Sequence, residues 1–107
     1  MPTNYFLYAR KSTDVEDRQV MSIEAQLSEL RILAKSEGLE IVAEFVEKRT
    51  AKMPGRPVFN EMLKRIQKGE AQAVICWKLD RLARNPVDGG QISWLLQQGT
   101  IQHIRTY

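Results

Sequence analysis

Asn4-Tyr5-Phe6-Leu7-Tyr8-Ala9 is an apolar and aromatic stretch near the N-terminus that predicts a β-strand. Residues 11–19 follow it with polar and charged side chains in no apolar period, which is typical of a loop. Three later stretches resemble the first in their β-branched and aromatic content, at residues 39–46, 73–77 and 101–107. The sequence therefore predicts four strands.

The segments between these strands have the spacing of helices. Ser22 is a favourable N-cap, and apolar residues recur at helical intervals after it until Gly38. Pro57 suits the first turn of a second helix that stops at Gly69, and Asn85 with Pro86 opens a third that stops at Gly99. Strands and helices thus alternate, which predicts a three-layer α/β fold with a largely parallel sheet of about four strands flanked by helices.

The composition fits one soluble domain. The chain has 107 residues, 43% hydrophobic and 27% charged, and a net charge of +3 that is compatible with a polyanionic partner without requiring one. No apolar stretch is long enough to span a bilayer and no signal peptide is present, so we expect a cytoplasmic protein without a membrane partner. The single cysteine, Cys76, lies in an apolar run and is expected to be a buried hydrophobic residue.

Polar side chains that could carry chemistry follow the first three strands. In open α/β sheets, ligands bind beyond the carboxyl ends of the strands, so these residues should meet at one edge of the sheet. The candidates, in chain order, are Tyr8, Arg10, Ser12, Lys48, Arg49, Arg56, Lys78, Asp80, Arg81 and Arg84.

One hydroxyl among several guanidinium groups suits phosphoryl transfer, because arginine forks bind and stabilise phosphate oxygens. Ser12 would be the nucleophile, although the sequence shows no histidine partner to take its proton. Asp80 could orient a guanidinium, or could form only a surface ion pair, and a serine in a polar loop is often only a solvated hydroxyl. His103 lies alone in an apolar strand and is expected to be structural.

Two further residue classes point to no additional site. Trp77 and Trp94 are expected to be core or partner-facing aromatics, since no second aromatic accompanies either one in a basic patch. One cysteine and one histidine are too few for zinc, and no paired acidic motif suggests magnesium. We therefore predict no metal site.

Four segments resemble the serine recombinase family, also called the resolvase/invertase family, in order and spacing. They are Tyr8-Ala9-Arg10-Lys11-Ser12, Ser22-Ile23-Glu24-Ala25-Gln26, Gly55-Arg56-Pro57-Val58-Phe59 and Lys78-Leu79-Asp80-Arg81-Leu82-Ala83-Arg84. The resemblance covers essentially the whole chain, and its details look most like the large serine recombinases of phages and mobile elements. It implies the resolvase-like form of the α/β fold.

The resemblance implies a mechanism for site-specific DNA recombination. Ser12 would attack a DNA phosphodiester and become joined to the 5′ phosphate, releasing a 3′ hydroxyl without a metal or nucleotide cofactor. Arg10, Arg56, Arg81 and Arg84 match the arginines that bind the scissile phosphate, and Asp80 matches the acidic member of that cluster. Supporting positions are Tyr8, Gln26 and Arg65, of which Arg65 stands roughly where smaller resolvases have an active-site lysine.

The resemblance also implies partners and further domains. The substrate would be double-stranded DNA, bound by a homodimer at each crossover site and by a tetramer in the synaptic complex. Residues 1–107 would be a catalytic domain truncated before a long dimerisation helix and the DNA-binding domains. We therefore expect this chain alone to lack recombination activity.

Two other classes of protein remain to be weighed. A receiver-like module needs acidic residues at the end of the first strand, where this chain has Arg10 and Ser12, and a flavodoxin-like module needs a phosphate-cradling loop. A non-catalytic module that binds only DNA or partner subunits needs positive charge but no hydroxyl at a fixed place. The retention of Ser12 together with the arginines favours the enzyme.

Overall fold

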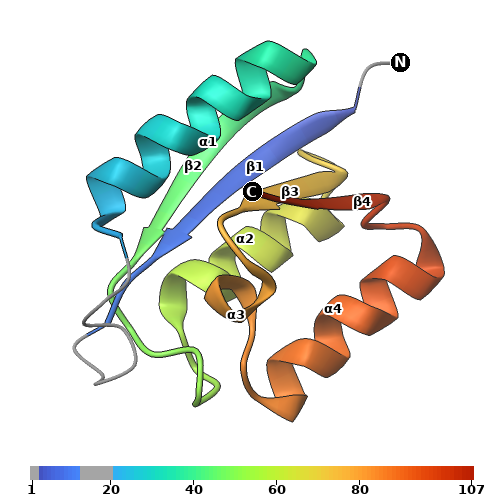
Figure 1. The fold of residues 1–107 in the computed structure, drawn as a ribbon. Helices are drawn as coiled ribbons and strands as arrows, with labels where there is room; N and C mark the ends of the chain where they lie inside the picture. The colour runs from blue at the N-terminus through green and yellow to red at the C-terminus, as the bar shows by residue number, and fades with distance from the viewer. Residues whose placement is uncertain (1–2, 13–20) are drawn as a thin grey trace.

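The computed structural model describes residues 3–12 and 21–107 and shows one four-stranded sheet (Figure 1). Its strands are β1 (Asn4–Arg10), β2 (Glu40–Glu47), β3 (Ala73–Cys76) and β4 (His103–Thr106), in the order β2-β1-β3-β4. Every pairing is parallel. The predicted parallel sheet of about four strands is confirmed, while most of the loop predicted at residues 11–19 lies outside the described residues.

The helices cover both faces of the sheet. α1 (Ile23–Glu37) lies on one face, and α2 (Pro57–Gln67) and α4 (Pro86–Gln98) lie on the other (Figure 1). The predicted helix boundaries hold, because the Ser22 and Asn85 side chains accept backbone N–H groups as N-caps and Gly38 ends α1 in the left-handed conformation. None of the helices in the described ranges is long and apolar enough to cross a membrane.

Alternation along β1 divides the core into two clusters. Phe6 and Tyr8 belong to the cluster under α2 and α4, whereas Tyr5, Leu7 and Ala9 belong to the cluster under α1. Because both faces are covered, the side chains of β1 and β3 are almost entirely buried. β1 and β3 are therefore the rigid centre from which the neighbouring loops extend.

One helix was not expected from the sequence. Residues 79–82 form the short helix α3 (Leu79–Leu82), which buries Arg81 and Leu82. Four residues make barely one turn, too short for helical periodicity to be recognised. The last strand is also shorter than predicted, because Ile101 donates its backbone N–H to Leu95 at the end of α4 rather than to a neighbouring strand.

The strand order brings the carboxyl ends of β1 and β3 side by side at one edge of the sheet. The chain leaves β1 toward α1 on one face and leaves β3 toward α4 on the opposite face. Ligands of open α/β sheets bind at this edge, beyond the carboxyl ends of the strands.

Candidate active site

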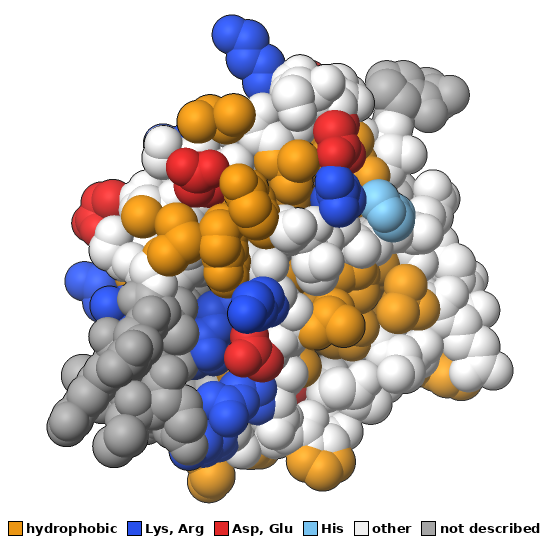
Figure 2. Space-filling view, in the orientation of Figure 1, with side chains coloured by type: hydrophobic (Ala, Val, Ile, Leu, Met, Phe, Trp, Pro, Cys, Tyr) orange, Lys and Arg blue, Asp and Glu red, His pale blue; other side chains and the backbone are white. Residues whose placement is uncertain are grey.

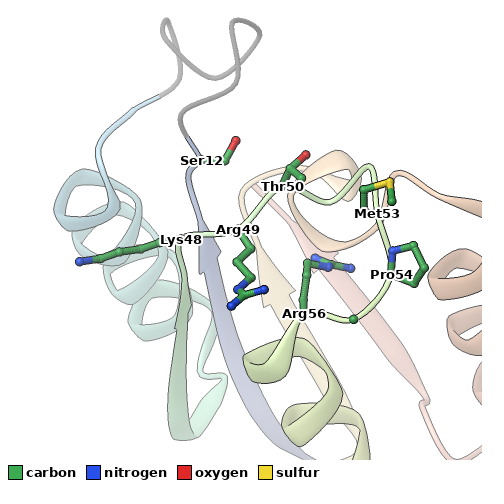
Figure 3. Close-up of a pocket in the computed structure, with 8 residues that line it drawn as sticks. Ser12, Lys48, Arg49, Thr50, Met53, Pro54 and Arg56 are labelled. Carbon is green, nitrogen blue, oxygen red and sulfur yellow. The ribbon is translucent and has the colours of Figure 1, made fainter.

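A pocket of about 330 Å³ opens at this edge of the sheet, between the loop after β1 and the loop that follows β2 (Figure 3). Its lining combines two hydroxyl groups with several basic side chains, from Ser12, Lys48, Arg49, Thr50, Met53, Pro54, Gly55 and Arg56. Ser12 and Arg56 are separated by 43 intervening positions in the chain but share this one cavity. The structure therefore brings the predicted nucleophile and one predicted arginine together.

Arg10 holds the surrounding loops in place. Its side chain is fully buried, with Nε donating to the Arg81 carbonyl at 3.0 Å and one terminal nitrogen donating to the Asp80 carbonyl at 3.0 Å. The other terminal nitrogen donates to the Arg49 carbonyl at 3.2 Å. A single guanidinium thus joins the end of β1 to the loop after β2 and to α3.

Arg81 and Gln26 fix the backbone just before Ser12. Arg81 is 2% exposed and donates to the Arg10 carbonyl at 3.4 Å, and its Nε donates to a carboxylate oxygen of Asp80 at 3.2 Å. Gln26 is fully buried in α1 and donates to the same Arg10 carbonyl at 3.1 Å. The chain reaches Ser12 two residues after this carbonyl, so its position is set from two other elements.

Tyr8 and Arg56 form a buried polar group beneath the pocket. Arg56 is 1% exposed and donates to the Tyr8 hydroxyl at 2.9 Å, while that hydroxyl donates to Glu47 at 3.1 Å. Burial raises the pKa of the Tyr8 phenol far above its usual value, against a smaller opposing effect of Arg56. Tyr8 therefore remains protonated and serves as both acceptor and donor.

The remaining predicted residues lie in different surroundings. The Asp80 side chain is about half exposed beside Arg81, and Arg84 is exposed, with its backbone N–H bonded to the Ala51 carbonyl in the loop that lines the pocket. Arg65 donates to Glu70 at 2.8 Å and lies over aromatic rings of the core. The structure does not bring Arg65 into the pocket.

Sequence analysis missed two buried carboxylates near this pocket. Glu47 accepts the Tyr8 hydroxyl and backbone N–H groups of α2, and Asp88 pairs with Arg56. For Glu47 the available signal was an acidic side chain at the last position of a strand, directly before a basic loop. Asp88 gave no such signal, because an acidic residue in the first turn of a helix is usual.

The surface around the pocket is basic. Figure 2 shows Lys and Arg side chains gathered around one acidic side chain on the lower part of this face. Exposed basic residues that follow β2 and β3 include Lys48, Arg49, Lys52, Lys78 and Arg84. Within residues 3–12 and 21–107, no group of three histidine, cysteine or acidic side chains lies close enough to hold a metal ion.

Comparison with known families identifies the family to which this chain belongs. A family model described as the N-terminal domain of resolvase matches residues 5–104, which is almost the entire chain. The chain belongs to the resolvase family. The membership predicted from four short segments is thereby confirmed, and it favours the recombinase over the receiver-like and flavodoxin-like alternatives. No curated protein matches the chain in sequence.

Solved structures of recombinases have the same fold. The N-terminal catalytic domain of TP901-1 integrase is 21% identical, with a TM-score of 0.81 over 96% of this resolvase-family chain and 76% of the other. A resolvase family site-specific recombinase from Streptococcus pneumoniae is 28% identical, with a TM-score of 0.71 over 97% and 72%. The C-terminal catalytic domain of ISC1926 TnpA, an IS607-like serine recombinase, is 17% identical, with a TM-score of 0.73 over 97% and 68%. The predicted resolvase-like fold is confirmed.

Proposed function

We propose that this resolvase-family domain supplies the active site for site-specific DNA recombination, in which strands are cleaved and rejoined through a covalent 5′-phosphoserine link. The proposed catalytic residues are Ser12, Arg10, Arg56, Asp80, Arg81 and Arg84, supported by Tyr8 and Gln26. The observation that carries the proposal is that Ser12 and Arg56, distant in the sequence, line one basic pocket. A hydroxyl in such a pocket lies where a phosphate would be bound.

The chemistry requires one nucleophile and stabilisation of charge on phosphate oxygens. The Oγ atom of Ser12 forms a bond to phosphorus while the bond between phosphorus and the 3′ oxygen breaks. Ser12 loses one proton and the leaving 3′ oxygen gains one, so no net proton is consumed. The phosphoserine link keeps the energy of the phosphodiester, so the 3′ hydroxyl can attack it to rejoin the strand without a nucleotide cofactor.

The arginines have different parts in this proposal. Arg56 and Arg84 stabilise the negative charge of the transition state. Exposed Arg84 can offer its guanidinium fork to phosphate oxygens, whereas buried Arg56 acts through its positive charge at the wall of the pocket. Arg10 and Arg81 keep the end of β1 against the loops after β2 and β3, which is supported by their bonds to backbone carbonyls. Asp80 orients Arg81, supported by the 3.2 Å contact between them.

We also propose the partners. The substrate is double-stranded DNA, and its phosphates fit the exposed lysines and arginines around the pocket. The protein acts in the cytoplasm as a homodimer at each site and as a tetramer during strand exchange, since each recombination event requires four strands to be cut.

Trapping the covalent intermediate tests the proposal. The protein, as its gene encodes it, is incubated with sheared genomic DNA of its own organism and denatured in detergent before the DNA is digested. Mass spectrometry should then find a nucleotide phosphate on the peptide that contains Ser12. The adduct should disappear in Ser12→Ala and persist in Ser28→Ala, which removes an exposed hydroxyl of α1.

Two results would contradict the proposed function. An adduct on Thr50, which carries the other hydroxyl of the pocket, would show that Ser12 is not the nucleophile. DNA binding without any adduct, under conditions in which the protein is folded, would favour the non-catalytic module instead.

A further inference from the structure

A buried ion pair lies behind the pocket, outside the residues recognised from the sequence. One terminal nitrogen of Arg56 lies 2.9 Å from a carboxylate oxygen of Asp88, and the two side chains are only 1% and 2% exposed. Asp88 is in the first turn of α4. The pair therefore joins α4 to the wall of the pocket.

Hydrogen bonds also fix the orientation of the Asp88 carboxylate. The Asn85 amide donates to the same carboxylate oxygen at 2.8 Å and to the Ala51 carbonyl at 3.0 Å. In return, the backbone N–H of Asp88 is bonded to the Asn85 side-chain oxygen at 2.9 Å. The carboxylate thus has one orientation, held by the cap of its own helix and by the loop that lines the pocket.

The contacts of Arg56 restrict the orientation of its side chain. Its terminal nitrogens donate to Tyr8, Leu82 and Asp88, and its guanidinium carbon lies 4.0 Å from the centre of the Phe59 ring. A guanidinium has five N–H donors, and the Nε donor of Arg56 is buried without a partner among the described residues. These contacts together fix the plane of the guanidinium.

Stability alone does not explain a buried pair of this kind. Replacing such a pair by apolar side chains of similar size is often neutral for stability, whereas the pair imposes a direction on both groups. Catalysis of phosphoryl transfer depends on that direction, because a displacement of about 1 Å in a catalytic group can cost roughly 100-fold in rate.

We propose that Asp88 is a positioning residue for Arg56, which it holds at the wall of the Ser12 pocket in the orientation needed to stabilise the transferred phosphate. This inference rests on the proposed function, in which the charge of Arg56 stabilises the phosphate. Asn85 assists by holding the carboxylate of Asp88.

Cleavage kinetics test this role. The substrate is the DNA sequence that was recovered attached to Ser12. With this DNA at saturating concentration, Asp88→Asn should lower the rate of adduct formation by about 10-fold or more. The DNA concentration for half-maximal rate should stay within about 2-fold, since DNA binding uses the exposed basic surface. Glu37→Gln, which breaks an exposed pair with Arg105 far from the pocket, should leave both quantities unchanged.

A double-mutant cycle separates positioning from a structural role. In an Arg56→Lys background, the fold-decrease in rate caused by Asp88→Asn should approach 1, because the guanidinium that Asp88 positions is gone. The proposal would be overturned if Asp88→Asn lowered the rate by the same factor in both backgrounds, or if it did not lower the rate of the wild type. If Asp88→Asn does not fold, Asn85→Ser keeps a helix cap but removes the amide that holds the carboxylate, and its smaller rate loss must also vanish with Arg56→Lys.

A spectroscopic measurement keeps the two proposals apart. In the nitrogen-labelled protein, the Nε–H signal of Arg56 should be sharp and slow to exchange, and Asp88→Asn should shift it and speed its exchange. An unchanged signal overturns the positioning role whatever the reaction is. If that signal responds but no adduct forms on Ser12, the proposed function fails while the positioning of Arg56 stands.

Discussion

Arg10 shows how one side chain can assemble a site. It is fully buried although it is charged, and a buried guanidinium is stable only when its donors are paired. Its partners are backbone carbonyls, which no substitution in the loops can remove. The loop that carries Arg49 and the short helix α3, which carries Asp80 and Arg81, are therefore held at defined positions relative to Ser12.

Cys76 provides a test of burial at a single position. The thiol is fully buried, and burial, with a smaller contribution from Asp80, raises its pKa from 9.0 to about 12. Between these values the unfolded chain loses the thiol proton while the folded chain keeps it. The free energy of unfolding should therefore be unaffected by this group below about pH 8 and fall as pH rises from 9 toward 12, by on the order of 1 kcal/mol per pH unit.

Urea unfolding at a series of pH values measures this effect. Cys76→Ala should show a shallower fall above pH 9 than the wild type, because the substitution removes the thiol but keeps the other titrating groups. Its cavity should lower stability equally at every pH, so only the slope is informative. Equal slopes in the two proteins would show that this thiol ionises at the same pH in both states.

Among the helices, α2 begins in an unusual way. Arg56 occupies its N-cap position without a side-chain cap bond, and N–H groups of its first turn are satisfied from a neighbouring strand instead. Glu47, at the end of β2, accepts the Phe59 N–H at 2.8 Å and the Val58 N–H at 3.4 Å. A carboxylate at this end of a helix also interacts favourably with the helix dipole.

Glu47→Gln should therefore destabilise the domain. The charge-assisted bonds to α2 and Tyr8 are weakened in a site that is 2% exposed, and we expect a loss of about 1–2 kcal/mol in the free energy of unfolding. Glu44→Gln is the matched control on the same strand, since its exposed pair with Arg31 is screened by solvent and should contribute little to stability. Urea denaturation of both variants measures these losses in the free energy of unfolding. Equal losses in the two variants would argue against the capping role of Glu47.

For the domain as a whole, the centre of the sheet should be its most stable part. β1 and β3 have neighbours on both sides and helices on both faces, whereas β2 and β4 lie at the edges with partly exposed side chains. Backbone amides open locally where few buried contacts hold them. Hydrogen exchange should thus be slowest in β1 and β3 and faster in β2 and β4.

Amide exchange measured residue by residue by NMR checks this order. Rates should be compared after correction for the intrinsic exchange of each residue type. Protection of β2 or β4 equal to that of β1 would mean that the edge strands unfold only with the entire domain.

Local features were predicted well because their causes are local. Ser22, Asn85 and Gly38 act within one helical turn, so their positions next to apolar periodic segments are enough to recognise helix ends. Cys76 is buried as predicted, and Trp77 packs partly against the core while Trp94 is exposed. His103, expected to be structural, lies 2.6 Å from the Tyr5 hydroxyl. The four family segments are likewise short runs that can be read directly.

Tertiary structure alone decided which side chains meet. The strand order β2-β1-β3-β4 determines that Arg10 reaches the carbonyl of Arg81, 71 positions later, and that Arg56 meets Asp88. Residue type and spacing reveal candidates for a site, but a contact between distant residues depends on the direction in which each element packs. The family and the α/β class were thus readable from the chain, whereas the buried partners that orient its arginines followed from packing.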